Sequence, residues 1–271
     1  MQSSKRKKIA IFGGTGAVGA YFSMSFVYGC PKCLFCDLSI IGESGSASLN
    51  HARKYGIQVH FNENNVSRDL EILPRYVKYL GEFDPSIGLQ DLVIVSLKQP
   101  SITSKVAAQI RQITDKNSIV GVVSNGLPFY FLRGLNLPDN KYINSIDKNG
   151  EISQILGDRN IIGIQPTIMA GAQSPGRINI MSPLEKVSVT IGSPYESSTY
   201  QMIPTLSFLK ETATMLNQVG INTTVVIGSF HRYIIERLAV NMVANVISAI
   251  VEQSVNKTLD HFIDSNISLH Y

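Results

Sequence analysis

The chain begins with a short apolar run that is followed at once by glycines. Lys8 to Phe12 has the pattern of a strand buried on both faces of a sheet. After the glycines, Ala17 to Tyr28 contains few helix breakers and predicts a helix. Lys32 to Asp37 then predicts a second strand. The order strand, turn, helix, strand is typical of the first half of a doubly wound α/β sheet.

The middle of the chain repeats this alternation less regularly. Its strongest signal is the apolar segment Asp91 to Leu97, which predicts a central strand, and Ser101 to Ile113 predicts the helix after it. Two shorter predicted strands, Ile57 to Phe61 and Tyr76 to Leu80, come before this central strand, and an antiparallel pair outside the parallel order is one interpretation of them. The remaining predicted strands are Ser118 to Ser124, Ile161 to Ile164 and Val187 to Ile191.

The pattern changes after Pro194. Thr199 to Val219 predicts a helix, Ile221 to Ile227 an extended segment, and Phe230 to Val255 a long helix with Ser229 as its N-cap. We therefore predict an α/β protein in two domains. Residues 1–194 form a Rossmann-type, mostly parallel sheet, and residues 195–271 form a smaller all-helical domain.

Composition narrows the class of protein. The hydrophobic content is 44% and the charged content 16%, as in a folded chain with an apolar interior. The net charge of +4 is small, and the basic run at residues 5–8 is typical of a solvated tail rather than a nucleic-acid site. The most apolar stretch, Ile234 to Val251, includes two charged residues and two asparagines, so it predicts a buried helix and no membrane span. A cytoplasmic location is the default expectation.

The three cysteines are close together but do not predict a metal site. Cys30, Cys33 and Cys36 form a C-x-x-C-x-x-C run. On the predicted strand the last two would point to opposite faces, and neither a fourth cysteine nor a nearby histidine completes a ligand set. We expect small buried residues in a reducing compartment.

The glycines after the first strand carry the clearest chemistry. Gly14, Gly16 and Gly19 form G-x-G-x-x-G between a strand and a helix. Such glycines allow a tight turn, close approach of a pyrophosphate and close packing of helix on strand, while N–H groups at the helix start hold the anion. The predicted dinucleotide-binding residues of this turn are Gly14, Thr15, Gly16, Ala17, Val18 and Gly19.

Asp37 bears on the choice of dinucleotide. Placed at the end of the second predicted strand, its carboxylate would bind the ribose 2′-hydroxyl, repel a 2′-phosphate and favour NAD(H). The alternative is that Asp37 points away and Arg53 or Lys54 meets the phosphate. The residues alone leave both open.

Three further motifs support a family resemblance. Val95 to Gln99 has the pattern V-x-x-K at a strand end, Val123 to Leu127 has a strand-end N-G, and Arg237 to Asn245 is similar to a helix motif K-L-x-x-N-x-x-x-N. Together with the glycine turn, in this order, they resemble ketopantoate reductase (2-dehydropantoate 2-reductase). The resemblance covers roughly residues 7–255.

The resemblance implies hydride transfer from NADP(H) to the ketone of a 2-keto acid, 2-dehydropantoate, giving pantoate for coenzyme A synthesis. It implies that Lys98 and Asn125 line the cleft beside the nicotinamide, and that Asn241 and Asn245 bind the substrate. Arg237 and Lys98 are the candidate catalytic residues.

The spacing of the helix motif agrees in part with the substrate-binding role that the resemblance implies. Arg237, Asn241 and Asn245 follow each other at four-residue intervals, so they share one helix face, with Ser248 nearby as a further substrate-binding candidate. A buried polar stripe needs partners. Either a substrate or a neighbouring helix could be the partner of this stripe, and the sequence does not decide between them.

Two departures from the family pattern matter. The family has a lysine where this chain has Arg237, and arginine is a poor general acid because it stays protonated. Only about sixteen residues follow Val255, where the family continues with more helices that supply a serine and a glutamate to the site. The resemblance therefore implies a truncated, incomplete helical domain, which either a partner subunit completes or which leaves the site open and impaired. A homodimer that covers the apolar helix faces is one expectation.

These observations leave three hypotheses. The first is a reductase of 2-dehydropantoate, the second a degenerate relative that binds the dinucleotide with little or no catalysis, and the third a reductase of another 2-keto acid whose carboxylate Arg237 binds.

Overall fold

The computed structural model describes residues 6–29, 36–75, 77–80, 83–133, 135, 142–157, 160–194, 199–228 and 230–250. By its contacts the chain forms two compact units. The first comprises Met1–Ser124 and Pro128–Phe230 and holds both sheets. The second comprises Asn125–Leu127 and the part that begins at His231.

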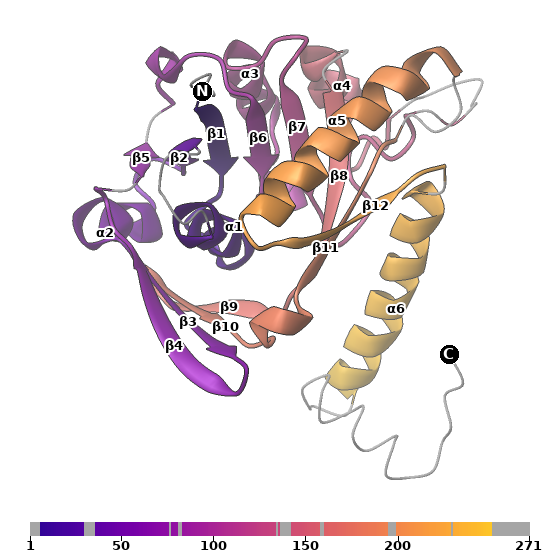
Figure 1. Ribbon diagram of the computed structural model, residues 1–271. Helices are drawn as coiled ribbons and strands as arrows, with labels where there is room; N and C mark the ends of the chain where they lie inside the picture. Colours follow the sequence, from indigo (N-terminus) through magenta and orange to yellow (C-terminus); the bar gives the residue numbers. More distant parts are fainter. Residues whose placement is uncertain are drawn as a thin grey trace. The chain divides into compact units, whose positions relative to one another are not determined.

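A large, mostly parallel sheet forms the centre of the first unit (Figure 1). Within the described ranges its eight strands, in spatial order, are β12 (Asn222–Val226), β11 (Ser188–Gly192), β8 (Asn160–Thr167), β7 (Ile119–Val123), β6 (Leu92–Val95), β1 (Lys7–Phe12), β2 (Cys36–Ile41) and β5 (Lys78–Leu80). The strands from β8 to β5 are parallel to one another, whereas β11 is antiparallel to β8 and parallel to β12. All residues of β6 and β7 are buried, which explains their unbroken apolar sequences.

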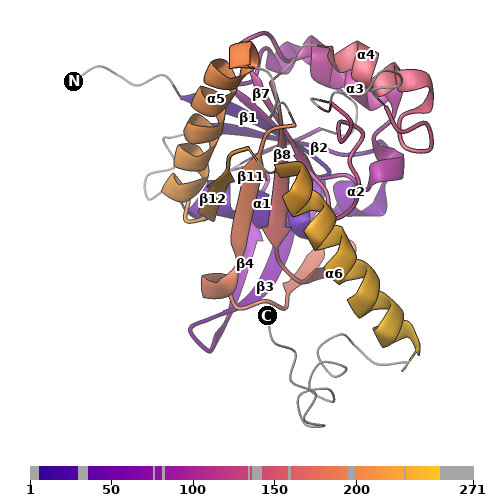
Figure 2. The same ribbon diagram turned by 90° about the vertical axis from the view of Figure 1, so that its right-hand side faces the viewer.

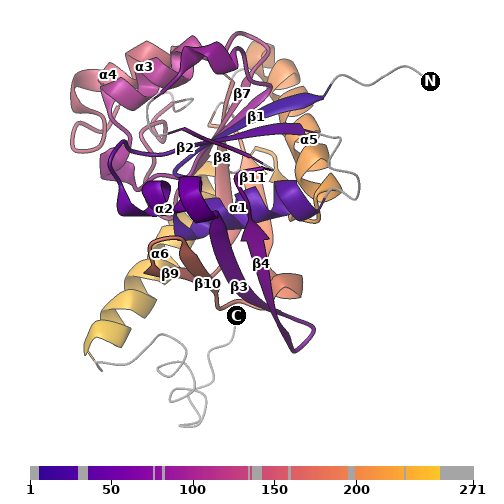
Figure 3. The ribbon, with the colours of Figure 1, turned by 90° about the vertical axis from the view of Figure 1, so that its left-hand side faces the viewer.

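Helices cover both faces of this sheet. The longer helices of the first unit are α1 (Ala17–Tyr28), α2 (Ala47–Tyr55), α3 (Ser104–Gln112), α4 (Glu151–Leu156) and α5 (Thr199–Gln218), and single 3₁₀ turns lie at Pro85–Ile87, Gln99–Ser101, Lys148–Gly150 and Leu184–Lys186. Helices α3 and α4 pack together on one face, and α5 packs on β8, β11 and β12 on the other (Figures 2 and 3).

A second, four-stranded sheet covers the outer side of α1. In order its strands are β4 (Val66–Ile72), β3 (Ile57–Glu63), β10 (Arg177–Ile180) and β9 (Ala170–Ser174). Helix α1 contacts all four of them as well as β1 and β2 (Figure 3). Its residues from Gly19 to Val27 are therefore buried on every side, which explains why the helix is apolar all round.

The predicted fold class is confirmed for the first unit, whose sheet is doubly wound and mostly parallel. The sheet extends past the predicted domain boundary at 194/195, because α5 packs on it and β12 adds a strand beside β11. The compact unit accordingly ends at Phe230. Phe230 itself is fully buried and lies where a Cβ at Gly192 would have to be.

The described part of the second unit consists of the turn Asn125–Leu127 and the helix α6 (Phe230–Ile250), whose first residue belongs to the first unit. The position of Ser229, the predicted N-cap, lies outside the described residues. The predicted burial of this helix holds for Phe230 and Ile234 at its start, but further along several described apolar side chains are exposed: Ile235, Val240, Met242, Val243 and Val246. Among the helices that the structure describes, none is long and apolar enough to cross a bilayer.

Candidate functional site

The carboxyl ends of β1, β2 and β6 lie level with one another. Phe12, the last residue of β1, is in register with Ile41 of β2 and Val95 of β6. Two backbone hydrogen bonds continue the alignment past the strands: Gly13 N–H donates to Ile41 O at 2.8 Å, and Ser96 N–H donates to Phe12 O at 2.8 Å. The chain passes from β1 to β2 on one side, while β6 adjoins β1 on the other, so this edge is a switch point of the kind at which open α/β sheets bind ligands.

The glycine turn at this edge depends on the absence of side chains. Gly13 has φ +76°, a left-handed conformation that suits glycine. A Cβ at Gly19 would overlap the carbonyl of Gly13, and one at Gly14 would lie 2.8 Å from Cγ2 of Ile40. These glycines therefore let α1 pack directly against the end of β1. Gly16 differs, because a Cβ there would meet only the Gly13 carbonyl, at 3.3 Å, and the residue is exposed.

The N-terminus of α1 is open to an anion. Gly16 is its N-cap, so no side chain caps the helix, and the first turn contains no acidic residue. Within the described part of the chain the N–H groups of Ala17 and Val18 have no acceptor. Unpaired N–H groups and the helix dipole favour a phosphate at this point. The turn therefore fits the pyrophosphate of a dinucleotide.

A cavity of about 750 Å³ opens at the same edge. Phe12, Ile41 and Glu43 line it from the ends of β1 and β2, and Leu97 and Thr103 line it from the segment between β6 and α3. Thr103 caps α3 by accepting a hydrogen bond from Val106 N–H at 3.3 Å. The cavity has the size expected of a small-molecule site.

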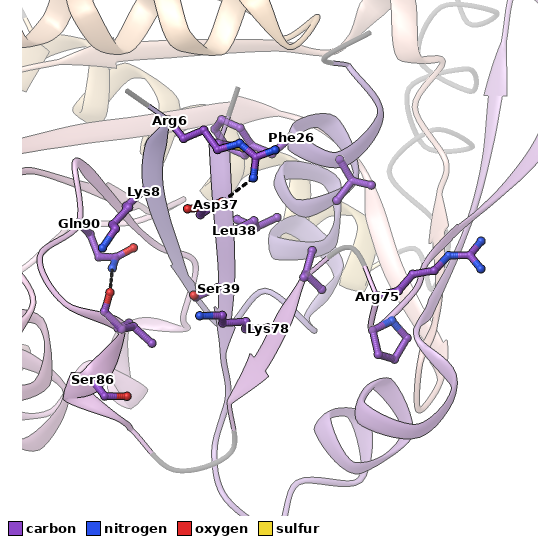
Figure 4. Close-up of a pocket in the computed structure, with 15 residues that line it drawn as sticks. Arg6, Lys8, Phe26, Asp37, Leu38, Ser39, Arg75, Lys78, Ser86 and Gln90 are labelled. Carbon is purple, nitrogen blue, oxygen red and sulfur yellow. Dashed lines mark hydrogen bonds and ion pairs between the residues drawn. The ribbon is translucent and has the colours of Figure 1, made fainter. Parts of the chain in front are cut away.

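Asp37 lies at the opposite edge of the sheet, which corrects the sequence-based expectation. The second strand ends at Ile41, and Asp37 is only its second residue. Four residues of strand, roughly 13 Å, separate it from the edge with the glycine turn. Its carboxylate accepts a hydrogen bond from Arg6 at 3.2 Å in a different pocket, of about 620 Å³ (Figure 4). Asp37 is therefore not placed to meet a ribose bound at the glycine turn.

Glu43 takes the place that was expected of Asp37. It follows Ile41 and Gly42 at the carboxyl end of β2, is exposed, and lines the cavity beside the turn. The signal was present in the sequence as an acid after an apolar run, but it was missed because the strand was expected to end at Asp37. The alternatives Arg53 and Lys54 lie in the last turn of α2.

Lys98 is placed at the edge that carries the glycine turn. It follows β6, caps the 3₁₀ turn Gln99–Ser101, and has an exposed side chain. Its backbone carbonyl accepts a hydrogen bond from Ser101 N–H at 2.8 Å, which holds the turn. No ion pair within the described residues occupies the Lys98 ammonium group.

The remaining predicted residues belong to the second unit. Asn125 follows β7 along the chain, and its carbonyl accepts a hydrogen bond from Nδ2 of Asn241 at 3.4 Å. Arg237 and Asn241 are half-buried on α6. Asn245 and Ser248 continue the same helix, but their side chains lie outside the described part of the structure.

The cysteine run is only partly described. Cys36 is half-buried at the start of β2, whereas Cys30 and Cys33 lie outside the described residues. In the ranges that the structure covers, no group of three or more His, Cys, Asp or Glu side chains is arranged to hold a metal ion.

Comparison with known proteins supports the fold. No protein-family model and no curated protein sequence matches the chain. Among solved structures, a proposed ketopantoate reductase from Ralstonia solanacearum MolK2 has a TM-score of 0.73 at 22% identity, covering 94% of this chain and 71% of its own. The 2-dehydropantoate 2-reductase from Porphyromonas gingivalis W83 has a TM-score of 0.63 at 17% identity, covering 94% and 76%.

A further solved structure extends the comparison to another enzyme. D-mandelate dehydrogenase, in a ternary structure with NADH and anilino(oxo)acetate, has a TM-score of 0.63 at 18% identity and covers 97% of this chain and 82% of its own. The chain thus has the fold of ketopantoate reductases, as its motifs predicted. At these identities the likeness concerns the fold.

Proposed function

We propose that this chain is a nicotinamide-dependent oxidoreductase that reduces a 2-keto acid. The observation that carries the proposal is the uncapped N-terminus of α1 behind the glycine turn, at the switch point of the sheet. The solved proteins of similar fold support it, because they include 2-dehydropantoate 2-reductases and a dehydrogenase solved with NADH.

The residues of the first unit would hold the cofactor. The N–H groups of Ala17 and Val18 bind the pyrophosphate, and the cavity between Glu43 and Thr103 accepts the adenosine half. When bound, the nicotinamide supplies the hydride. Lys98, at the same edge of the sheet, provides a positive charge that stabilises a developing alkoxide.

The residues of the second unit would bind the substrate. An arginine presents a rigid fork of donors that matches a carboxylate, so we assign the carboxylate of the keto acid to Arg237. Asn241, one turn further along α6, offers an amide that donates to and accepts from polar substrate groups, and Asn245 and Ser248 extend the same series. We propose 2-dehydropantoate as the keto acid, on the strength of the helix motif and the fold.

The experiment is an oxidation assay of the reduced cofactor. Loss of reduced-nicotinamide absorbance is followed with NADH and with NADPH, using 2-dehydropantoate and a small panel of other 2-keto acids. Turnover that is fastest with 2-dehydropantoate supports the proposal, and preference for another acid shifts the substrate but retains the reaction class. Cofactor binding without turnover on any keto acid contradicts it.

A binding protein without catalysis is the second candidate. It is favoured by Arg237, because an arginine stays protonated, whereas a lysine at this position could release a proton to the product. The same assay separates the two candidates. A homodimer remains a prediction, motivated by the exposed apolar side chains of α6, and sedimentation of the purified chain tests it.

A further inference from the structure

The segment that follows β2 is held in place on both sides of Glu43. Gly42 N–H donates to Leu80 O at 3.0 Å, which ties the end of β2 to β5. The carbonyl of Glu43 accepts a hydrogen bond from Ser46 N–H at 3.1 Å, and Ser46 in turn caps α2. The backbone at Glu43 is thus fixed at the edge that carries the glycine turn.

The Glu43 carboxylate is uncommitted. Its side chain is exposed and lines the cavity, and no ion pair or side-chain hydrogen bond of the described residues involves it. Asp37 provides the contrast, since its carboxylate is paired with Arg6 at the far edge. A carboxylate in the position of Glu43 can accept hydrogen bonds from both hydroxyls of a ribose.

The basic residues that follow Glu43 most closely in the sequence, Arg53 and Lys54, make contacts away from its carboxylate. Arg53 donates from Nε to the carbonyl of Tyr79 at 3.2 Å, and the Lys54 ammonium lies 4.8 Å from the ring centre of Tyr55. Both belong to the last turn of α2, away from its start beside Glu43. Lys105 is the basic residue among the described residues that line the cavity. It belongs to α3 and therefore lies across the cavity from the end of β2.

We propose that Glu43 makes this chain select NADH over NADPH, by binding the adenosine ribose hydroxyls and repelling a 2′-phosphate. The proposal rests on the dinucleotide site proposed above. A phosphate close to Glu43 would place like charges together, which is unfavourable, and among the described residues that line the cavity no cation comes from the β2 side to offset them. The family resemblance by itself implies NADP(H), so this residue changes the expected cofactor.

The test measures dissociation constants of NADH and NADPH with the full chain, by nucleotide fluorescence and without a keto acid. We expect NADH to bind at least about tenfold more tightly than NADPH. Glu43→Gln should reduce this ratio, and Glu43→Arg should invert it. Tighter binding of NADPH to the unaltered chain, or the same ratio in all three proteins, overturns the assignment of Glu43. Failure of both nucleotides to bind contradicts the dinucleotide site itself, which distinguishes the two proposals.

Two control variants sharpen the result. Asp37→Asn removes the acid at the far edge and should leave the ratio unchanged. Lys105→Gln should also leave NADH the preferred nucleotide, whereas a change of preference there would assign selection to α3 and overturn the proposal. Added salt provides a further readout. Since salt screens exposed charges, the preference of the unaltered chain for NADH over NADPH should decrease as ionic strength rises. The preference of Glu43→Gln should depend less on ionic strength.

Discussion

Asn241 donates a hydrogen bond from Nδ2 to the main-chain carbonyl of Asn125, at 3.4 Å. This distance is longer than that of a typical N–H···O bond, so the bond is weak. The Oδ1 atom of Asn241 accepts no hydrogen bond from the described residues. Asn241 can therefore exchange this bond for one to a ligand while the helix stays in place.

Replacement of Asn241 tests its role in substrate binding. We expect Asn241→Ala to lower kcat/KM for the keto acid by about 10- to 100-fold, because a polar substrate group is then left in the site without its hydrogen-bond partner. The dissociation constant for the dinucleotide and the thermal midpoint should remain close to those of the unaltered chain. Asn222→Ala, an exposed asparagine on β12, serves as the matched control. Unchanged kcat/KM in Asn241→Ala would remove Asn241 from the site.

Arg237→Lys tests whether the arginine has a function of its own. If the guanidinium holds a carboxylate with two parallel hydrogen bonds, a lysine loses one of them, and KM should increase by roughly tenfold. Arg232→Lys is the control, because Arg232 is on the same helix but forms an exposed ion pair with Glu236 at 2.7 Å. A marked increase in turnover in Arg237→Lys would instead show that the arginine impairs proton transfer.

Substitutions of two glycines in the turn should distinguish an effect on dinucleotide binding from an effect on folding. Gly16→Ala adds a methyl group that only the Gly13 carbonyl opposes, so stability should change by less than about 1 kcal/mol. The methyl lies at the start of α1, and dinucleotide affinity should fall by about tenfold or more. Gly19→Ala would overlap the Gly13 carbonyl and should destabilise the fold itself.

Gly171→Ala is the control for both turn variants, since its nearest neighbour is Cε of Met181, at 3.9 Å in the small sheet. Chemical unfolding and nucleotide fluorescence are measured on all three proteins. Unaltered dinucleotide affinity in a folded Gly16→Ala variant would contradict the placement of the pyrophosphate.

Buried tyrosines predict alkaline unfolding. Burial raises the pKa of Tyr21 to about 12, and it also raises the pKa values of Tyr79 and Tyr130. Because these values exceed the ordinary value of 10.0, the folded state retains protons that the unfolded state releases. Stability should be fully present below about pH 10 and decrease as the pH rises toward 12.

Tyrosinate absorbance and circular dichroism, recorded together against pH, check this expectation. The buried phenols should ionise only as the helical signal is lost. Tyr55→Phe, at an exposed position, should leave the transition unchanged. Complete ionisation of all tyrosines in a chain that keeps its circular dichroism would contradict the buried positions.

The central elements were predictable because one physical signal dominates each of them. The strand β6 is an unbroken apolar run between polar residues, and the G-x-G-x-x-G turn has few alternatives once it stands between a strand and a helix. The predicted second strand was displaced toward the N-terminus because Asp37 looked like its end. In the structure Asp37 is an exposed residue near the start of β2. A charged side chain is compatible with the strand there because it faces solvent and pairs with Arg6.

The peripheral elements lacked such a signal. Helix α2 buries only Leu49 and Ala52, so its sequence is polar along most of its length. Strand β4 has mostly exposed residues, since it forms an edge of the small sheet. Side-chain placement depends on contacts between segments far apart in the chain, which explains why Glu43 became evident only when the register of β1 with β2 was known.

The hydrogen bonds from Gly13 to Ile41 and from Ser96 to Phe12 use main-chain atoms alone. Most neighbouring side chains can therefore be replaced without removing the bonds that hold the edge at which the cofactor is proposed to bind. The exceptions are Gly13, Gly14 and Gly19, at which an added Cβ would lie less than 3.0 Å from neighbouring atoms. The same backbone arrangement is therefore compatible with very different side chains, and a solved structure with 22% sequence identity matches 94% of this chain with a TM-score of 0.73.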